Sequence, residues 1–348
     1  MNIQENITIL ISFHHTRTKE LERKIEYFSN SKFKIIMIGQ TDKYEKLRKL
    51  KKINNVQNLK ILISKNKYPG EKVLEAEKII DTEYMIFLGD DDFITFDYLE
   101  KAIKILDKNK NVHVVDCFTT KFKFNESNNS LIFFNNYMID YYLFLKRNNF
   151  NLKGGNLFER INKLENCFNP NLHHCVVRKN TFYFSLKTIQ NNKASDVLNY
   201  YDKIFFLLFL LKGDIYFLDL HGYIRQVENS LREKNLPDKY FLKKKLFLED
   251  FLNDNNVLNY LYLIIHKELK CDIQIFNQHI IKFHKVIKNH YNLKNKKKDQ
   301  GFIKKLRINI NNYLHHRYDH FNEILNIFKI PLINKSACSK IKRLYREI

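Results

Sequence analysis

The first 90 residues alternate between short, uninterrupted apolar segments and charged stretches, and this alternation constrains the fold most strongly. Apolar segments at 7–13, 33–38, 59–63 and 84–88 have the length of buried β-strands, and the charged stretches between them have helical spacing. Strands that are apolar along their whole length are typical of a parallel sheet that helices cover on both faces. The sequence therefore predicts an α/β fold.

The loops after these strands are where a site is expected, because open α/β sheets bind ligands beyond the carboxyl ends of their strands. These loops span 14–18, 39–42, 65–70 and 89–92, and the last one reads Gly89-Asp90-Asp91-Asp92. Adjacent carboxylates repel one another, and a divalent cation such as Mg²⁺ or Mn²⁺ would relieve the repulsion. The alternative is a solvated acidic turn ahead of a helix, where aspartate is favoured for other reasons.

The remainder of the chain divides into a mixed part and a helical part. Shorter strands are predicted at 112–118, 121–124, 131–134, 175–177 and 215–218, with a helix over 195–212 that ends at Gly213 and an irregular region over 150–172. From 237 onward the pattern is helical, at 240–252, 258–269, 273–291 and 302–328. We therefore predict a domain at 1–235 and a basic, mainly α-helical C-terminal domain at 236–348.

The net charge of +22 is concentrated toward the end of the chain, where residues 239–348 carry 23 Lys and Arg against 9 Asp and Glu. Such a surface attracts nucleic acid, anionic lipid or a phosphorylated substrate, although a merely solvated basic face is the alternative. The longest apolar run, 204–211, is too short for a bilayer crossing of about 20 residues. No export signal is visible and the five cysteines are scattered, so we expect a cytoplasmic protein without a disulfide framework or zinc site.

In their order along the chain, several segments resemble the nucleotide-diphospho-sugar glycosyltransferases of the GT-A fold, family-2-like, in a bacterial branch with an Asp-Asp-Asp-Phe signature. The matching segments, which span roughly residues 1–230, are 8–17, 35–42, 83–95, 173–182, 200–213 and 222–230. The resemblance implies a Rossmann-like, mostly parallel sheet. It also implies a metal-dependent, inverting transfer of a sugar from a nucleotide-diphosphate donor, most simply a UDP-sugar, in surface polysaccharide or glycoconjugate synthesis.

The resemblance also assigns roles to individual residues. Asp90 and Asp92 would form the aspartate-any-aspartate element that contacts the donor ribose and Mn²⁺ or Mg²⁺, and Asp91 could share either task. Asp202 would be the catalytic base, with Asp196 as the second candidate, because an acceptor hydroxyl must lose its proton as it attacks. The other candidates are His14, Thr16, Arg17, Asp42, Lys72, Arg225 and Ser230 for the donor, and His174 and Arg178 for the acceptor cleft. Packing or solvation is the alternative for each of them.

Two departures from the family pattern bear on these roles. Val227 stands where many relatives place a metal-side histidine, and Val73-Leu74 stands where many have an Arg-Asn pair. A non-catalytic scaffold with a degenerate GT-A domain is therefore one alternative. A basic nucleic-acid-binding protein or nuclease is another, although no nucleic-acid motif is present. The acceptor would be a glycan, lipid-linked or protein molecule, and the basic C-terminal region could lie on an anionic membrane at its inner face. Transfer of a phospho-sugar also stays open.

Overall fold

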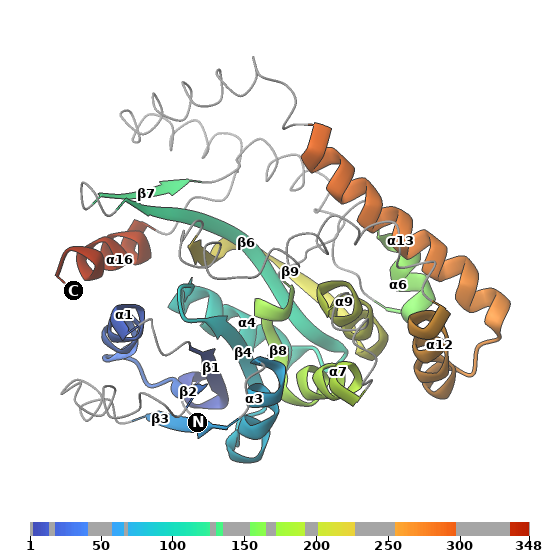
Figure 1. The fold of residues 1–348 in the computed structure, drawn as a ribbon, viewed down its shortest axis with the longest axis horizontal. Coiled ribbons are helices and arrows are strands. Elements are labelled where there is room, and N and C mark those ends of the chain that lie inside the picture. The colour runs from blue at the N-terminus through green and yellow to red at the C-terminus, as the bar shows by residue number, and fades with distance from the viewer. Residues whose placement is uncertain are drawn as a thin grey trace.

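A single mixed sheet forms the centre of the protein (Figure 1). The computed structural model describes residues 3–13, 18–40, 58–65, 69–125, 130–134, 154–164, 172–191, 201–226, 255–296 and 335–347. Within these residues the strands are β1 (Ile7–Ser12), β2 (Lys34–Gln40), β3 (Leu59–Ser64), β4 (Tyr84–Gly89), β5 (Phe93–Ile94), β6 (Val112–Asn125), β7 (Ser130–Phe134), β8 (Val176–Arg178) and β9 (Asp214–Gln226). The predicted α/β class is confirmed.

The order of the strands is β3-β2-β1-β4-β8-β6-β9-β5, and β7 pairs with β6. The first four in this order are mutually parallel, β8 runs antiparallel between β4 and β6, and β6 and β9 are parallel. The chain proceeds outward from β1 to β2 and β3 on one side and then returns to place β4 on the other side of β1. The strand order therefore reverses between the carboxyl ends of β1 and β4.

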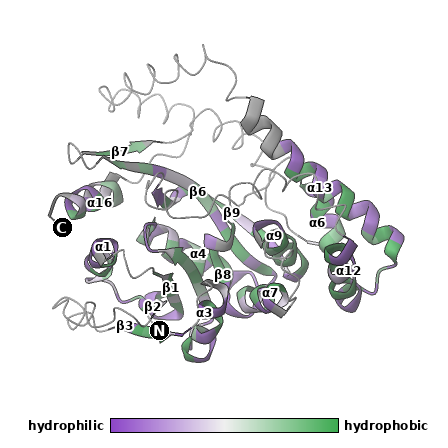
Figure 2. Ribbon diagram, in the orientation of Figure 1, coloured by the Kyte–Doolittle hydropathy of each residue, from purple (hydrophilic) through white to green (hydrophobic). Residues whose placement is uncertain are grey.

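Helices cover both faces of the sheet. The described helices are α1 (Thr18–Phe28), α3 (Pro69–Ala76), α4 (Phe96–Lys108), α6 (Leu157–Lys163), α7 (Lys179–Asn191), α9 (Tyr201–Lys212), α12 (Asn255–Leu269), α13 (Ile273–Lys296) and α16 (Lys335–Glu347), with short 3-10 turns η1 (Ile3–Asn6), η4 (Glu77–Ile79) and η5 (Leu172–His174). In β1, Ile9 faces a core shared with α1, α4 and α16, whereas Leu10 faces a core shared with α3, α7 and α9. Strands β1 and β4 are accordingly buried along nearly their whole length, whereas the long strands β6 and β9 combine hydrophobic and hydrophilic residues (Figure 2).

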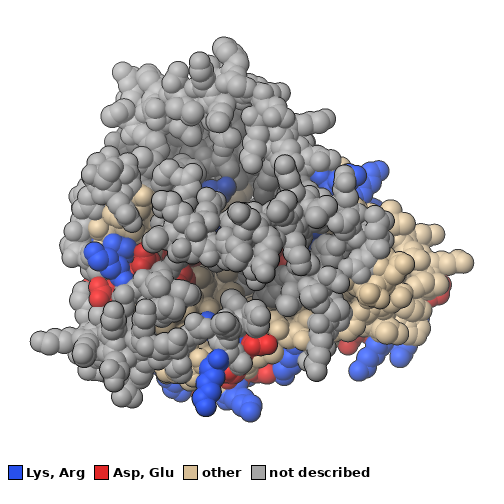
Figure 3. Space-filling view, in the orientation of Figure 1, with Lys and Arg blue, Asp and Glu red and all other residues tan. Residues whose placement is uncertain are grey.

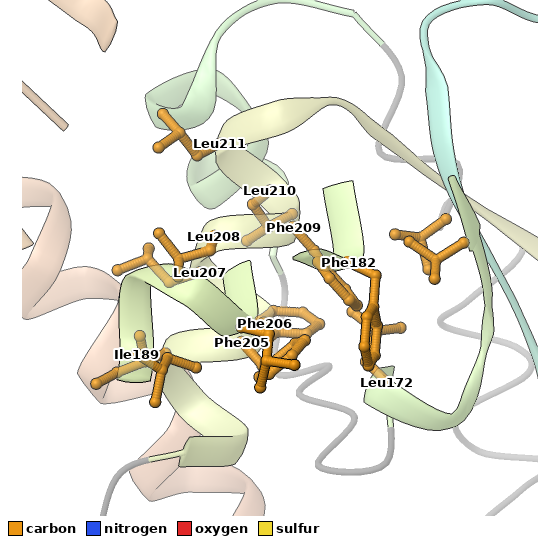
Figure 4. Packing of buried hydrophobic residues seen from close by; sticks show 14 of the residues in the cluster. Leu172, Phe182, Ile189, Phe205, Phe206, Leu207, Leu208, Phe209, Leu210 and Leu211 are labelled. Carbon is orange, nitrogen blue, oxygen red and sulfur yellow. The ribbon is translucent and has the colours of Figure 1, made fainter. Parts of the chain in front are cut away.

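The two cores, which we call the α4 core and the α9 core, differ in how their central helix is buried. Helix α4 is amphipathic, with buried residues such as Leu99 and Ile103 on one side. Helix α9 is buried on all sides, since every residue from Ile204 to Leu211 is less than a tenth exposed. Figure 4 shows its phenylalanines and leucines packed against Phe182, Ile189 and Leu172. A helix that is apolar all round requires partners on every side, and the neighbouring helices provide them.

The described helices beyond residue 236 belong to these same two cores. Helices α12 and α13 contribute Val257 and Phe276 to the α9 core, whereas α16 contributes Ile341 to the α4 core and packs against α1. The expected boundary near 235 and the helices expected at 240–252 and 302–328 lie outside the described residues, so the division into two domains stays a prediction.

Several elements differ from the predicted ones. The strands expected at 112–118 and 121–124 form one continuous strand, β6. The strand expected at 215–218 extends over 13 residues as β9, because it pairs with the long β6 along most of its length. Helix α6 lies in the region expected to be irregular. It begins at Asn156, whose side-chain oxygen accepts hydrogen bonds from the backbone N–H groups of Phe158 and Glu159 at 2.9 and 3.2 Å. This N-cap stabilises a helix that is too short to show clear periodicity.

No helix among the described residues is both long and apolar enough to cross a membrane. On the face seen in Figure 3, the described lysine and arginine side chains lie in small groups with aspartate and glutamate between them. Lys282, Lys285 and Lys288 of α13 are exposed.

Candidate functional site

The three adjacent aspartates lie at the reversal point of the sheet. Gly89 is the last residue of β4, Asp90 and Asp91 form a turn, and Asp92 leads directly into β5. Strand β5 pairs with β9, which brings the end of β9 alongside the turn. The acidic turn (residues 90–92) therefore occupies the position at which α/β sheets of this kind bind ligands.

Asp92 joins the acidic turn to β9. Its carboxylate is buried, with an exposed fraction of 6% for the residue. One oxygen accepts a hydrogen bond from the hydroxyl of Tyr223, and the other accepts one from the backbone N–H of Gln226 at 3.3 Å. Burial and the neighbouring Asp91 raise the pKa of Asp92, whereas the Tyr223 hydrogen bond lowers it. Burial together with the Asp92 charge raises the pKa of Tyr223, so the phenol stays protonated and donates.

Gly89 leaves room for two of the carboxylates. A Cβ atom at this position would lie 3.0 Å from Oδ1 of Asp91 and 3.2 Å from Oδ2 of Asp92. Both oxygens therefore crowd the same side of the Gly89 backbone, and a larger residue would displace them. Glycine therefore allows the closest approach of these two charged side chains to the backbone.

Three cationic side chains of described residues act electrostatically on the acidic turn. Lys24 of α1 interacts with all three carboxylates, Lys72 of α3 interacts with Asp90, and Arg225 of β9 interacts with Asp92. Burial lowers the pKa of Lys72, while Asp90 and Glu75 raise it. The structure thus brings the predicted donor residues Lys72 and Arg225 to the aspartates.

The acidic turn fits an open cation site. Mg²⁺ and similar ions bind oxygen donors, commonly one or two carboxylates completed by water and substrate phosphates. Asp90, Asp91 and Asp92 supply such oxygens, but within the described part of the chain no three or more His, Cys, Asp or Glu side chains are grouped to enclose an ion. These carboxylate oxygens therefore suit a cation that binds together with a phosphate group, rather than a structural metal centre.

Of the two predicted acceptor residues, only His174 lies near the acidic turn. Its Nδ1 donates to the carbonyl of Phe87 at 2.7 Å, and its ring stacks between Phe87 and Tyr223 with centroids 5.5 and 5.3 Å away. Arg178 pairs with Tyr84 at the start of β4, roughly 16 Å from Gly89 at the rise of a β-strand. Its guanidinium donates to backbone carbonyl groups at 2.7 to 3.3 Å. Arg178 therefore stabilises the end of the strands that is remote from the acidic turn.

Asp202, the predicted base, is exposed in the first turn of α9. The C-terminal end of α9 lies at the amino ends of the strands. Asp214, two residues after this helix, donates its backbone N–H to the carbonyl of Asn111 at 2.8 Å, just before β6 begins. A helix of 12 residues is about 18 Å long, similar to the strands it covers. Since α9 also packs against η5, which holds His174, Asp202 lies toward the same edge as the acidic turn.

Several predicted residues fall outside the described part of the chain: His14, Thr16, Arg17, Asp42, Asp196, Val227 and Ser230. Of the departures from the family pattern, Val73 is described and is buried in the α9 core, with Leu74 packed against that core. An Arg-Asn pair at these two positions would have to place polar side chains in that apolar environment.

Sequence reasoning missed two residues of the site, Lys24 and Tyr223. Lys24 could have been found, because it falls on the apolar side of the first helix, three residues after Leu21 and four before Phe28. A lysine at such a position is rarely buried without a reason. No local signal marks Tyr223, whose contact with Asp92 depends on the pairing of β5 with β9.

Comparisons with known proteins agree with this arrangement. Residues 9–168, which include the acidic turn, match the family model described as Glycosyl transferase family 2. The segment and the mixed sheet agree with the GT-A-like α/β fold that was expected. No curated protein sequence matches the chain.

Among solved structures, the chain is similar to TarS from S. aureus. It is 14% identical to TarS with a TM-score of 0.44, covering 78% of this chain and 46% of TarS. It is also 14% identical to TarS 1-349 in complex with UDP-GlcNAc, with a TM-score of 0.43, covering 82% and 81% of the two chains. The chain thus spans less than half the length of the longer TarS structure.

Proposed function

We propose that the protein is a glycosyltransferase that moves a sugar from a nucleotide-diphosphate donor to a glycan, lipid-linked or protein acceptor. The observation that carries this proposal is the acidic turn at the reversal point of the sheet, held to β9 by Asp92 and surrounded by Lys24, Lys72 and Arg225. The match of residues 9–168 to the glycosyltransferase family 2 model supports the same assignment.

The donor would bind with its diphosphate near the acidic turn. Lys72 and Arg225 would contact the phosphates, because cationic side chains suit phosphate oxygens. Asp90 and Asp91 would face the donor and a divalent cation, either Mn²⁺ or Mg²⁺. When bound, the cation would neutralise charge that develops on the departing diphosphate. Asp92 would hold the turn through Tyr223 and Gln226 and complete the cation's surroundings with its remaining lone pairs.

Transfer with inversion requires a base on the acceptor side. We assign this role to Asp202, which would take the proton of the acceptor hydroxyl as its oxygen bonds to the anomeric carbon and the bond from that carbon to the diphosphate breaks. His174 would line the acceptor side of the site, since it stacks on the same Tyr223 that binds Asp92. Asp196 stays the second candidate for the base.

The biological setting follows from the acceptor class and the charge. We propose a role in surface polysaccharide or glycoconjugate synthesis, in the cytoplasm. The basic C-terminal region, with exposed lysines on α13, would attract an anionic membrane that holds a lipid-linked acceptor.

Thermal unfolding with candidate ligands tests the proposal. UDP and UDP-GlcNAc, the ligands of the TarS structures, would be tried first, followed by other nucleotide diphosphates and nucleotide-sugars, each with and without Mn²⁺. A ligand at 100 times its Kd adds about 2.7 kcal/mol and raises Tm by a few degrees. We expect a shift that needs both nucleotide and Mn²⁺ and that is lost in Asp92→Asn.

A matched control is Asp97→Asn, which changes an exposed aspartate of α4 that pairs only with Lys101 at 3.1 Å among the described ion pairs. It should keep the full ligand-dependent shift. The net charge of +22 favours nucleic acid as the second candidate ligand. Absence of any nucleotide effect, together with nucleic-acid binding that falls steeply with salt, would replace the glycosyltransferase proposal.

A further inference from the structure

Lys24 is an anomaly in the packing of α1. Its side chain is completely buried, and its ammonium nitrogen is one of two buried side-chain nitrogens without a hydrogen-bond partner among the described residues. The nitrogen lies 3.9 Å from the centroid of the Phe93 ring. Phe93 directly follows Asp92, and all three carboxylates of the acidic turn act electrostatically on the Lys24 ammonium.

Packing among the described residues does not explain a lysine at this position. A buried ammonium without a hydrogen bond is costly, and contact with an aromatic face compensates only in part. A methionine has nearly the same length and would suit the α4 core without that cost. Residues that reduce stability in this way are often retained because a binding or catalytic site needs them.

The charges around the acidic turn indicate what Lys24 does. Asp92, Asp91 and Asp90 all act on the Lys24 ammonium. Burial lowers the pKa of Lys24 to about 8 and the three carboxylates raise it, so the side chain is largely protonated at neutral pH. Unlike a surface lysine, this cation cannot move into solvent when a second cation approaches.

We propose that Lys24 is a built-in counter-ion that prevents the acidic turn from holding a divalent cation by itself, so that the cation and the nucleotide diphosphate bind together. This inference rests on the proposed function. Without a compensating positive charge, the three carboxylates would attract a divalent ion whether or not the donor was present. The positive charges of Lys24, Lys72 and Arg225 act on these carboxylates and balance them. The ligand that the charges favour is therefore a cation already paired with an anionic diphosphate.

The experiment compares wild type with Lys24→Met, Lys24→Gln and Lys24→Arg. Lys19→Met is the control, because Lys19 is an exposed lysine on the same helix. Binding of Mn²⁺ alone is measured by electron paramagnetic resonance, and binding of UDP by calorimetry with and without Mn²⁺. Thermal unfolding is recorded for every variant.

We expect both neutral variants to bind Mn²⁺ alone roughly tenfold more tightly or better, because a fixed like charge has been removed. The factor by which Mn²⁺ strengthens UDP binding should fall correspondingly. Lys24→Arg and Lys19→Met should bind Mn²⁺ as wild type does. Lys24→Met should unfold at the same temperature as wild type or a higher one.

Three results would overturn the inference, and they are distinguishable from failure of the proposed function. Unchanged Mn²⁺ affinity in Lys24→Met and Lys24→Gln, in a background where wild type binds UDP with Mn²⁺, refutes the counter-ion role alone. Neutral variants that do not fold while Lys24→Arg folds would make Lys24 a structural residue. Wild type that binds no nucleotide under any condition refutes the proposed function and, with it, this inference.

Discussion

The hydroxyl of Tyr223 donates a hydrogen bond to the carboxylate of Asp92, and these two residues stand 131 positions apart in the chain. The contact joins the two halves of the site, because Asp92 ends the acidic turn and Tyr223 lies on the last strand of the sheet. Tyr223 also stacks on His174, the residue proposed for the acceptor side. A single tyrosine thus contacts both the acidic turn and His174.

Replacing Tyr223 by phenylalanine removes the hydroxyl and keeps the ring. We expect a loss of about 1–2 kcal/mol in the free energy of unfolding, because the buried Asp92 carboxylate loses a donor. Mn²⁺-dependent UDP binding should weaken as the acidic turn loosens. Urea unfolding at pH 8 and calorimetry measure the two effects, and Tyr262→Phe on α12 is the control. If both variants had the same free energy of unfolding and the same UDP affinity as wild type, the hydrogen bond would contribute to neither stability nor binding.

Replacing Gly89 by alanine tests the crowding of the carboxylates. The added Cβ would meet oxygens of Asp91 and Asp92 at 3.0 and 3.2 Å, so at least one carboxylate must move. We expect Mn²⁺-dependent UDP binding to weaken at least roughly tenfold, since electrostatic ligation depends on geometry. Circular dichroism would establish that the sheet is intact. Undiminished binding would mean that the turn relaxes freely and that its observed geometry is not needed.

Replacing Asp202 by asparagine separates catalysis from binding. If Asp202 takes the acceptor proton, kcat should fall by about 10² to 10⁴, while Mn²⁺-dependent UDP binding stays unchanged. Steady-state kinetics with the identified donor and calorimetry supply the two readouts. Asp196→Asn is measured in parallel. A large loss in Asp196→Asn with normal turnover in Asp202→Asn would transfer the role of base to Asp196.

His113 makes stability depend on pH. Burial, followed by the charges of Arg178 and Arg160, lowers its pKa to about 4, and its Nδ1 lies 2.6 Å from the hydroxyl of Thr181. The unfolded chain therefore takes up a proton near pH 6.5, before the folded protein does, so the stability that His113 contributes above pH 6.5 is lost as pH falls toward 4.

Between pH 7.5 and 5.0 this effect should amount to about 1–2 kcal/mol, after allowance for solvent screening. Urea unfolding of wild type and His113→Gln at both pH values isolates it, because the titrating carboxylates are common to the two proteins. The variant should lose less stability on acidification. Parallel curves for the two proteins would mean that His113 titrates alike in the folded and unfolded chain.

The local pattern of apolar and charged residues was sufficient to predict the first four strands of the chain. The strands around Ile9, Ile36, Leu62 and Ile86 were predicted because each is a largely apolar segment between charged stretches. The acidic turn could also be predicted, since it directly follows the last of them. The later strands were harder, because β9 is long only through its pairing with β6.

The arrangement around the acidic turn depended on contacts that the sequence does not encode locally. Lys72 and Arg225 were predicted from resemblance and do lie near the aspartates. The engagement of both Asp92 oxygens by β9 could not be predicted, because β8 and β6 intervene in the sheet between β4 and β9. Arg178 was expected at the acceptor cleft together with His174, which precedes it by four residues. Strand β8 instead places Arg178 opposite Tyr84, at the start of β4 and away from the acidic turn.

The contact between α1 and α16 cannot form during synthesis until α16 has been made, long after α1. Lys340 Nζ donates to the carbonyl of Tyr27 at 2.6 Å, and these residues are 313 positions apart. At 5–20 residues per second, roughly 15 to 60 s separate the synthesis of α1 from that of the helix that covers it. During this interval the apolar flank of α1 stays uncovered on the ribosome. A pause or premature stop before residue 335 would leave buried α1 residues such as Tyr27 and Phe28 without the α16 side chains that share their core.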